Sequence, residues 1–137
     1  MYGTIIQVFD KTVNDNPDAI VQLGKNRAGS FIPRTYATLQ RESRALALAL
    51  RHLGVQRGDI VGIISDNRSE WFVTDLAILS LGAADTPRGR DAMPYEVEYI
   101  LGVTRCRMAF AENKDQLNKI LALKPSLPDL ERIVLIE

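Results

Sequence analysis

Residues 59–87 read DIVGIISDNRSEWFVTDLAILSLGAADTP, and this stretch decides the fold class. It opens with a nearly continuous apolar run at 59–65, which is typical of a strand whose two faces are both covered by helices. After a polar turn, residues 71–81 are apolar almost all round a helix, which predicts a deeply packed helix. Gly82 ends that helix, and 83–87 forms a short second strand. The stretch therefore predicts a β-α-β unit with parallel strands.

The same alternation continues on both sides of this unit. Upstream, leucines at helical spacing predict a long helix from about Thr38 to Leu53, with Gly54 at its C-terminal cap. The expected downstream elements are helices at 91–102 and 115–123 and strands at 106–111 and 133–136. Alternating helices and strands with short links predict a three-layer α/β fold on a mainly parallel sheet.

Two capping residues are predicted from the local pattern. Asn67 is expected to cap the buried helix, with Glu70 three residues later as its capping-box partner. Asp91 is expected to cap the following helix, which Gly102 would end.

The first 37 residues predict a helix followed by a hairpin. Thr4 can cap a helix with Ile5, Val8, Phe9 and Val13 on one side, and Pro17 stops it because proline has no backbone donor. Runs at 19–23 and 31–36, joined by the polar turn 25–30, predict two paired strands. Pro33 makes the second of them an edge or irregular strand.

These elements predict a single domain over residues 1–137. Within it, 1–37 hold the helix and hairpin, and 38–137 hold the alternating α/β elements.

Composition excludes several classes of protein. The 137 residues are 46% apolar and 25% charged, which fits a globular domain with a real core. Seventeen basic and 17 acidic residues cancel, so no basic face points to nucleic acid. The N-terminus lacks a signal-peptide pattern, and the most apolar segment, 71–81, is too short to span a bilayer. We therefore expect a cytoplasmic protein, with peripheral membrane contact left open.

The chain contains no complete catalytic or metal-binding motif. Neither phosphate-binding glycine pattern is present, and there is no serine-nucleophile elbow. A single cysteine, Cys106, and a single histidine, His52, leave no zinc set. Cys106 is expected to be inert core, between Arg105 and Arg107 pointing outward from an alternating strand.

Four side chains near strand ends are the candidates for substrate or interface contacts: Asn67, Arg68, Trp71 and Arg88. Asn67 follows a parallel strand, where open α/β sheets bind ligands, although helix capping explains it equally. Trp71 could line an acyl or aromatic pocket, or it could be core. Arg88 could meet a phosphate or carboxylate, or it could lie at the surface or an interface.

Several short motifs stand in a fixed order: RTY at 34–36, LGV at 53–55, RGDIV at 57–61, SDNRSEW at 65–71, DLAIL at 75–79 and LGA at 81–83. Together they resemble AMP-forming acyl-CoA synthetases, which belong to the adenylate-forming superfamily. DTPRG at 85–89, YIL at 99–101 and FAEN at 110–113 are similar to the long-chain fatty-acid branch. Thr38, Ser69 and Arg90 depart from the family pattern, and none of these departures bears on catalysis.

The resemblance implies the N-terminal part of a long-chain fatty-acid–CoA ligase. Such enzymes use ATP, Mg²⁺ and coenzyme A to make acyl-CoA through an acyl-adenylate, releasing pyrophosphate and AMP. Their phosphate loop, adenine-binding motifs and mobile C-terminal domain come later in the chain. We therefore expect a scaffold without catalytic, cofactor-binding or metal-binding residues, inactive alone, whose partner is the remainder of its own parent chain. A homodimer stays open. The chain ends directly after a buried-type strand, which agrees with the expectation of a longer parent chain.

Two other hypotheses are compatible with the residues. One is a stand-alone α/β ligand-binding module with a polar site near Asp66 or Arg88. The other is a protein-interaction module derived from the same family.

Overall fold

The computed structural model describes residues 3–26 and 28–137. They form two compact units. The first contains the chain up to Val55 together with Arg68–Leu81, and the second contains Gln56–Asn67 and Gly82–Glu137. A single domain over residues 1–137 stays a prediction.

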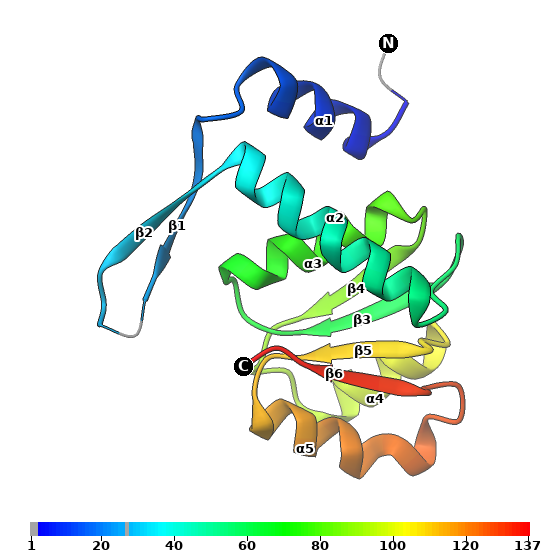
Figure 1. The fold of residues 1–137 in the computed structure, drawn as a ribbon. Coiled ribbons are helices and arrows are strands. Elements are labelled where there is room, and N and C mark those ends of the chain that lie inside the picture. The colour runs from blue at the N-terminus through cyan, green and yellow to red at the C-terminus, as the bar shows by residue number, and fades with distance from the viewer. Residues whose placement is uncertain (1–2, 27) are drawn as a thin grey trace. The chain divides into compact units, whose positions relative to one another are not determined.

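The first unit contains three helices, α1 (Ile5–Asp15), α2 (Tyr36–His52) and α3 (Ser69–Ser80) (Figure 1). The Thr4 hydroxyl accepts from the Gln7 N–H at 3.2 Å, so the predicted cap of α1 is confirmed. The apolar core of this unit consists of Leu39, Val73 and Leu76, with Ile6, Phe9, Val21, Leu46 and Phe72 packed against it. The predicted apolar side of α1 was partly wrong: Val13 is buried, but Ile5 is 69% exposed.

The hairpin of the first unit pairs β1 (Ile20–Lys25) with β2 (Phe31–Thr35) in antiparallel register, as predicted. The pairing is irregular between Ile20 and Gln22. Pro33 lies in a strand with only one partner, where its missing donor is tolerated. The expected turn at 25–30 includes Arg27, which lies outside the described residues.

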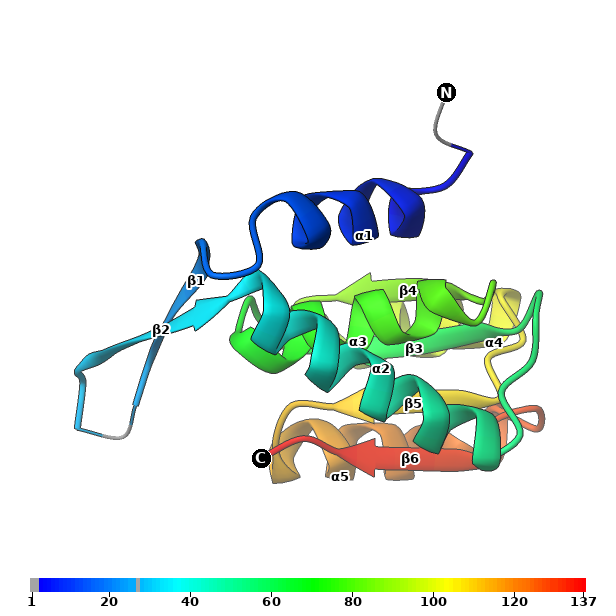
Figure 2. The same cartoon turned by 45° about the horizontal axis from the view of Figure 1, so that its top comes forward.

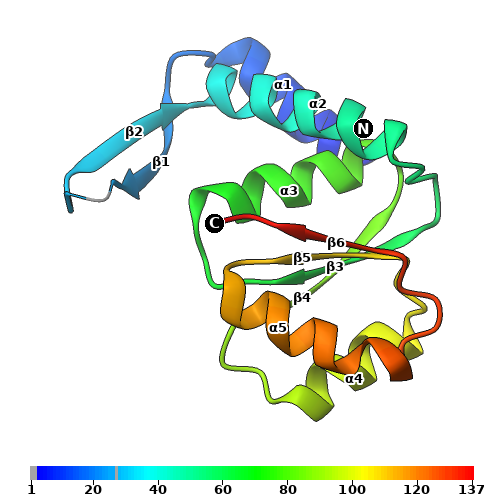
Figure 3. The ribbon, with the colours of Figure 1, turned by 60° about the horizontal axis from the view of Figure 1, so that its bottom comes forward.

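The second unit is built on a parallel sheet of β3 (Ile60–Ile64), β4 (Ala84–Arg88), β5 (Met108–Ala111) and β6 (Arg132–Leu135). The strand order is β4-β3-β5-β6 (Figure 2). The helices α4 (Pro94–Val103) and α5 (Lys114–Leu123) lie together on one face, and the short 3₁₀ helix η1 (Lys124–Ser126) follows α5 (Figure 3). The α/β class and the parallel sheet are therefore confirmed.

The core of the second unit lies between the sheet and these two helices. Ile64, Val97, Leu101 and Ile120 are almost fully buried in one cluster. Gly62 in β3 makes room for it, because a Cβ atom there would lie 2.5 Å from Leu101 Cδ2.

The capping prediction for α3 was wrong. The N-cap position is Arg68, which makes no side-chain cap, and the helix begins at Ser69. The Glu70 carboxylate, expected to reach back to Asn67, instead accepts from Arg68 Nε at 2.8 Å. An ion pair two residues apart therefore replaces the capping box.

The capping prediction for α4 was also wrong. Asp91 lies three residues before the helix, whose N-cap is Met93 and whose first residue is Pro94. The Met93 N–H donates to Glu96 Oε2 at 2.8 Å, which satisfies an amide at the helix start. Proline is favoured at the first helical position because its fixed φ suits a helix and no donor is needed there.

Two helices end with the same pair of backbone hydrogen bonds. After α2, the Gly54 N–H donates to Arg51 O and the Val55 N–H donates to Leu50 O, both at 3.0 Å. This is a Schellman motif, and Gly54 has a φ of 94°. The predicted glycine at the end of α2 is therefore confirmed.

After α4 the equivalent left-handed residue is Arg105, with a φ of 50°. Its N–H donates to Gly102 O, and the Cys106 N–H donates to Leu101 O. Two predictions are corrected here: Gly102 lies inside the helix rather than ending it, and Arg105 belongs to a helix cap rather than an alternating strand.

We expect replacement of Arg105 by glycine to raise the free energy of unfolding by about 0.5–1 kcal/mol, because a Cβ atom disfavours positive φ. The reciprocal change Gly54→Arg should lower it by about 1 kcal/mol, since no atom lies near a Cβ there and only backbone strain differs. Urea unfolding followed by circular dichroism measures both. Equal signs for the two changes would contradict this explanation.

Candidate functional site

The strand order of the second unit reverses between β3 and β5. The chain passes from β3 to β4 on one side and from β5 to β6 on the other side of the sheet. In open α/β sheets, ligands bind outside the carboxyl ends of the strands at such a switch point. The polar residues that follow β3, β4 and β5 are therefore the first place to look for chemistry.

Four of these residues bind one another, and we call them the carboxylate latch: Ser65, Asp66, Arg90 and Glu112. Glu112 Oε2 accepts from the Asp66 N–H at 2.6 Å and from Ser65 Oγ at 3.3 Å. Asp66 in turn accepts from Arg90, through the backbone N–H at 3.1 Å and through Nε at 2.7 Å. The latch thus joins the segments that follow three neighbouring strands.

The backbone around the latch is fixed by short polar contacts. Glu112 follows β5 directly, and its N–H donates to Ile64 O at 3.0 Å. The Glu112 side chain is only 12% exposed. From α5, Lys119 Nζ donates to Arg90 O at 3.1 Å and to Ala92 O at 2.7 Å. These bonds hold the segment after β4 in the position that the latch needs.

The latch is suited to holding structure rather than to catalysis. Its two carboxylates are already occupied by N–H, hydroxyl and guanidinium donors. Among residues 3–26 and 28–137, no group of three or more His, Cys, Asp and Glu side chains could hold a metal ion. Burial raises the pKa of the Cys106 thiol, more than its contact with Thr104 lowers it, so the thiol stays protonated at neutral pH.

The four residues predicted as substrate or interface contacts lie outside the latch. Arg68 and Trp71 belong to the first unit, where Arg68 binds Glu70 and Trp71 is half-buried at the start of α3. Asn67 and Arg88 belong to the second unit and are exposed at the ends of β3 and β4. Arg88 donates to its neighbour Pro87 O at 3.2 Å. Their role in binding stays a prediction.

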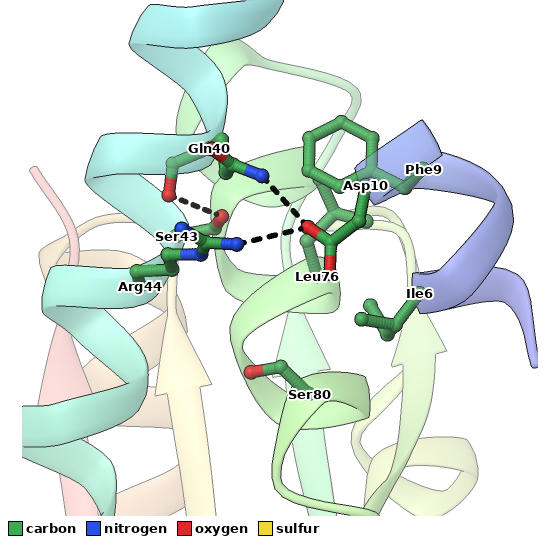
Figure 4. A pocket seen from close by; sticks show the side chains of 8 residues that line it. All are labelled: Ile6, Phe9, Asp10, Gln40, Ser43, Arg44, Leu76 and Ser80. Carbon is green, nitrogen blue, oxygen red and sulfur yellow. Dashed lines mark hydrogen bonds and ion pairs between the residues drawn. The ribbon is translucent and has the colours of Figure 1, made fainter. Parts of the chain in front are cut away.

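The first unit has a pocket of about 210 Å³ between its helices (Figure 4). Asp10 of α1 lies at its centre, where Oδ1 accepts from Gln40 Nε2 at 2.7 Å and from Arg44 at 3.2 Å. The other lining residues are Ile6, Phe9, Ser43, Leu76 and Ser80. The hydrogen bonds of Asp10 connect α1 to α2, and Ile6, Phe9 and Leu76 form the apolar part of the lining. The pocket is therefore part of the packing between the helices.

Sequence reasoning named Asp66 as the neighbourhood of a possible polar site, but it missed Arg90 and Glu112 of the latch and Asp10 of the pocket. In the sequence, Arg90 stands out as a departure from a family pattern, and Glu112 as part of the FAEN motif at 110–113. Asp10 and Gln40 are 30 positions apart. The one local signal was an acidic residue soon after each of two predicted parallel strands, at Asp66 and Glu112, since such ends meet at one edge of a sheet.

Comparison with known proteins settles the family. The AMP-binding enzyme family matches residues 9–137, which is nearly the whole chain. The chain belongs to the AMP-binding enzyme family. The resemblance to AMP-forming acyl-CoA synthetases is thereby confirmed, and the matched region corresponds to the N-terminal part of acyl-CoA ligases.

Two relatives of this AMP-binding family chain are named as CoA ligases. Long-chain-fatty-acid–CoA ligase FadD15 of Mycobacterium tuberculosis is 33% identical over 120 residues, which cover 88% of this chain and 20% of that protein. Long-chain-fatty-acid–CoA ligase ACSBG2 of Xenopus laevis is 28% identical over 131 residues, 96% of this chain and 18% of that protein. The chain thus spans about a fifth of the length of the curated relatives it matches.

Solved structures agree with the family fold. The anthranilate CoA ligase AuaEII, solved with anthranoyl-AMP, is 25% identical, with a TM-score of 0.83 over 98% of this chain and 25% of that chain. Acetoacetyl-CoA synthetase from Streptomyces lividans shares the fold at a TM-score of 0.85, over 95% of this chain and 21% of that chain. In the described part of the AMP-binding family chain, no helix is long and apolar enough to cross a membrane.

If the latch stabilises the second unit, Glu112→Ala should lower the free energy of unfolding of the protein by about 1.5–3 kcal/mol. The reason is that the Ser65 hydroxyl and the Asp66 N–H lose a charged acceptor. The matched control is Glu131→Ala, which removes an exposed carboxylate bound to Arg107 and should change stability by less than about 0.5 kcal/mol. Urea unfolding compares the two variants. Equal losses would mean that the latch contributes no more than a surface ion pair.

The pKa of Glu70 gives a pH-dependent test of the first unit. Burial raises this pKa, but the hydrogen bond from Arg68, a backbone hydrogen bond and the charges of Arg68 and Arg34 together lower it by more, so it lies below the ordinary value of 4.5. A carboxyl group with a lowered folded pKa contributes stability above its unfolded pKa and loses that contribution as pH falls through the folded pKa.

We therefore expect Glu70→Gln to destabilise the chain at about pH 6 and to have a diminishing effect as pH falls below about 4.5. Thermal unfolding across this range measures the difference. In an Arg68→Gln background most of the effect should disappear, because the partner is already gone. A loss that is independent of pH and of Arg68 would rule out the ion pair as its cause.

Proposed function

We propose that this chain is the N-terminal scaffold part of a long-chain fatty-acid–CoA ligase. The parent enzyme would convert ATP, a fatty acid and coenzyme A into acyl-CoA, AMP and pyrophosphate through an acyl-adenylate. The observation that carries the proposal is 33% identity over 88% of the chain to a protein named as a long-chain-fatty-acid–CoA ligase. The second relative of that name, from a vertebrate, supports the same substrate class.

The scaffold role follows from how the polar groups of the chain are used. Latch carboxylates bind donors of their own unit, and the thiol of Cys106 is buried. In the proposed parent, ATP, Mg²⁺ and coenzyme A are held by residues outside these 137. The chain supports the structure around that site, and it is inactive alone.

The four candidate contacts fit this proposal as surfaces toward the remaining chain. Asn67 and Arg88 are exposed at the carboxyl ends of β3 and β4, where a ligand or a neighbouring segment would approach a parallel sheet. Arg68 and Trp71 open α3 and are assigned the same role. A cytoplasmic location, with peripheral membrane contact during fatty-acid capture, belongs to the same proposal.

The native protein from its source should yield peptides that continue beyond Glu137. It should also exchange pyrophosphate into ATP when a fatty acid is present, with kcat/KM for palmitate at least about tenfold above that for acetate, because each buried methylene adds binding energy. The chain of 137 residues alone is the control and should show no exchange. A native protein that ends at Glu137 and is stabilised by ATP would instead support a stand-alone ligand-binding module.

A further inference from the structure

The exposed side of α2 in the first unit carries three arginines. Arg41, Arg44 and Arg51 follow one another at helical spacing, so they fall along one side of the helix. Leu48 lies between them on the same side and is 71% exposed. All four side chains are exposed, and we call them the basic face.

The opposite side of α2 is packed inside the first unit. Its buried residues are Leu39, Ser43, Ala47 and Leu50. Leu39 belongs to the apolar core of this unit, together with Val73 of α3. Packing therefore fixes the rotation of α2, and it keeps the basic face exposed.

Nearby acidic side chains neutralise only part of this face. Glu42, the one acidic residue of α2, is already bound to another arginine at 3.2 Å. Asp10 of α1 binds Arg44 at 3.2 Å. Within residues 3–26 and 28–137, the side chains of Arg41 and Arg51 make no hydrogen bond or ion pair. Two guanidinium groups are therefore available to an anionic partner.

Charge is also distributed unevenly between the two units. The whole chain is neutral, yet basic residues outnumber acidic residues in the first unit and the reverse holds in the second. A local excess of one charge attracts partners of the opposite charge even where the net charge is zero. The first unit is therefore the part of the chain suited to an anionic surface.

We propose that the basic face binds the surface of an anionic lipid bilayer. Guanidinium groups bind phosphate oxygens through parallel N–H donors, and helices that lie on membranes combine such groups with apolar side chains that enter the acyl boundary. From Arg41 to Arg51 the helix rises about 15 Å, which is farther than one small phosphate ligand reaches. A bilayer offers headgroups over that whole distance and hydrocarbon beneath them for Leu48.

The proposal deepens the proposed function and rests on it for the reason to expect a membrane. A long-chain fatty acid enters bilayers because its hydrocarbon chain leaves water. A ligase for such acids therefore meets its substrate at a membrane surface. The basic face would hold the first unit at that surface.

Cosedimentation with lipid vesicles tests the proposal for the 137-residue chain and for the native protein from its source. Vesicles of phosphatidylcholine mixed with phosphatidylserine should bind at least about tenfold more tightly than phosphatidylcholine alone, because each arginine near an anionic surface contributes roughly fivefold. Salt at about 1 M should remove most of this preference. Equal binding to the two kinds of vesicle, or binding to neither, would overturn the proposal.

Matched variants test whether the basic face is the surface that binds. Arg41→Gln combined with Arg51→Gln should lower the affinity for anionic vesicles about 25-fold, since two contributions are lost. The control combines Arg57→Gln with Arg105→Gln, which removes the same charge from exposed arginines of the second unit and should lower the affinity less than about threefold. Equal losses for the two double variants would assign binding to net charge and overturn the proposal.

Two further outcomes separate this inference from the proposed function. Fatty-acid-dependent pyrophosphate exchange by a native protein that does not bind anionic vesicles overturns the inference and leaves the proposed function standing. Vesicle binding through the basic face without such exchange supports the inference and contradicts the proposed function. Binding to soluble polyglutamate, with no binding to vesicles, would assign the face to an acidic protein and overturn the inference.

Discussion

The second unit depends on one carboxylate placed where two parallel strands end. Parallel strands β3 and β5 bring Ser65, Asp66 and Glu112 to the same edge, and there the Asp66 N–H meets Glu112 Oε2 at 2.6 Å. Without that acceptor, a backbone donor at a sheet edge would be left to compete for water, which costs more than an ordinary hydrogen bond contributes. Arg90 completes the arrangement from the segment after β4, so three connections are fixed by one set of charges.

A polar cluster at a switch point usually indicates a ligand site. Polar groups that bind one another, however, can instead have a structural role. In the latch, both Asp66 oxygens and Glu112 Oε2 already accept from Ser65, Asp66 and Arg90, whereas Glu112 Oε1 lies 4.0 Å from Arg90 Nη1. The latch therefore stabilises the edge of the sheet where three neighbouring segments of the chain meet.

The sequence predicted the helices and strands, which depend on periodic patterns. It failed at the helix caps, where several nearby polar side chains can satisfy the same backbone donors. Continuous apolar runs identified β3 and α3, and alternation gave the parallel sheet, because these signals are repeated over many residues. The caps at Asn67 and Asp91 were wrong because a cap depends on one backbone geometry. Glu70 found a guanidinium two residues away, and the start of α4 was satisfied by Glu96. The latch could not be predicted, since Asp66 and Glu112 are 46 positions apart and only the folded sheet brings them together.

The hairpin shows the same limit from the other direction. Its strands and register follow from local pattern, yet the sequence gives no reason why Leu23 and Phe31 should stay exposed. The folded pairing places them on one face, while Gly24 on the other face lets the backbone of β1 approach Ser69 at the start of α3. Leu23 and Phe31 are both 61% exposed, so their side chains contribute little burial to the stability of the described chain.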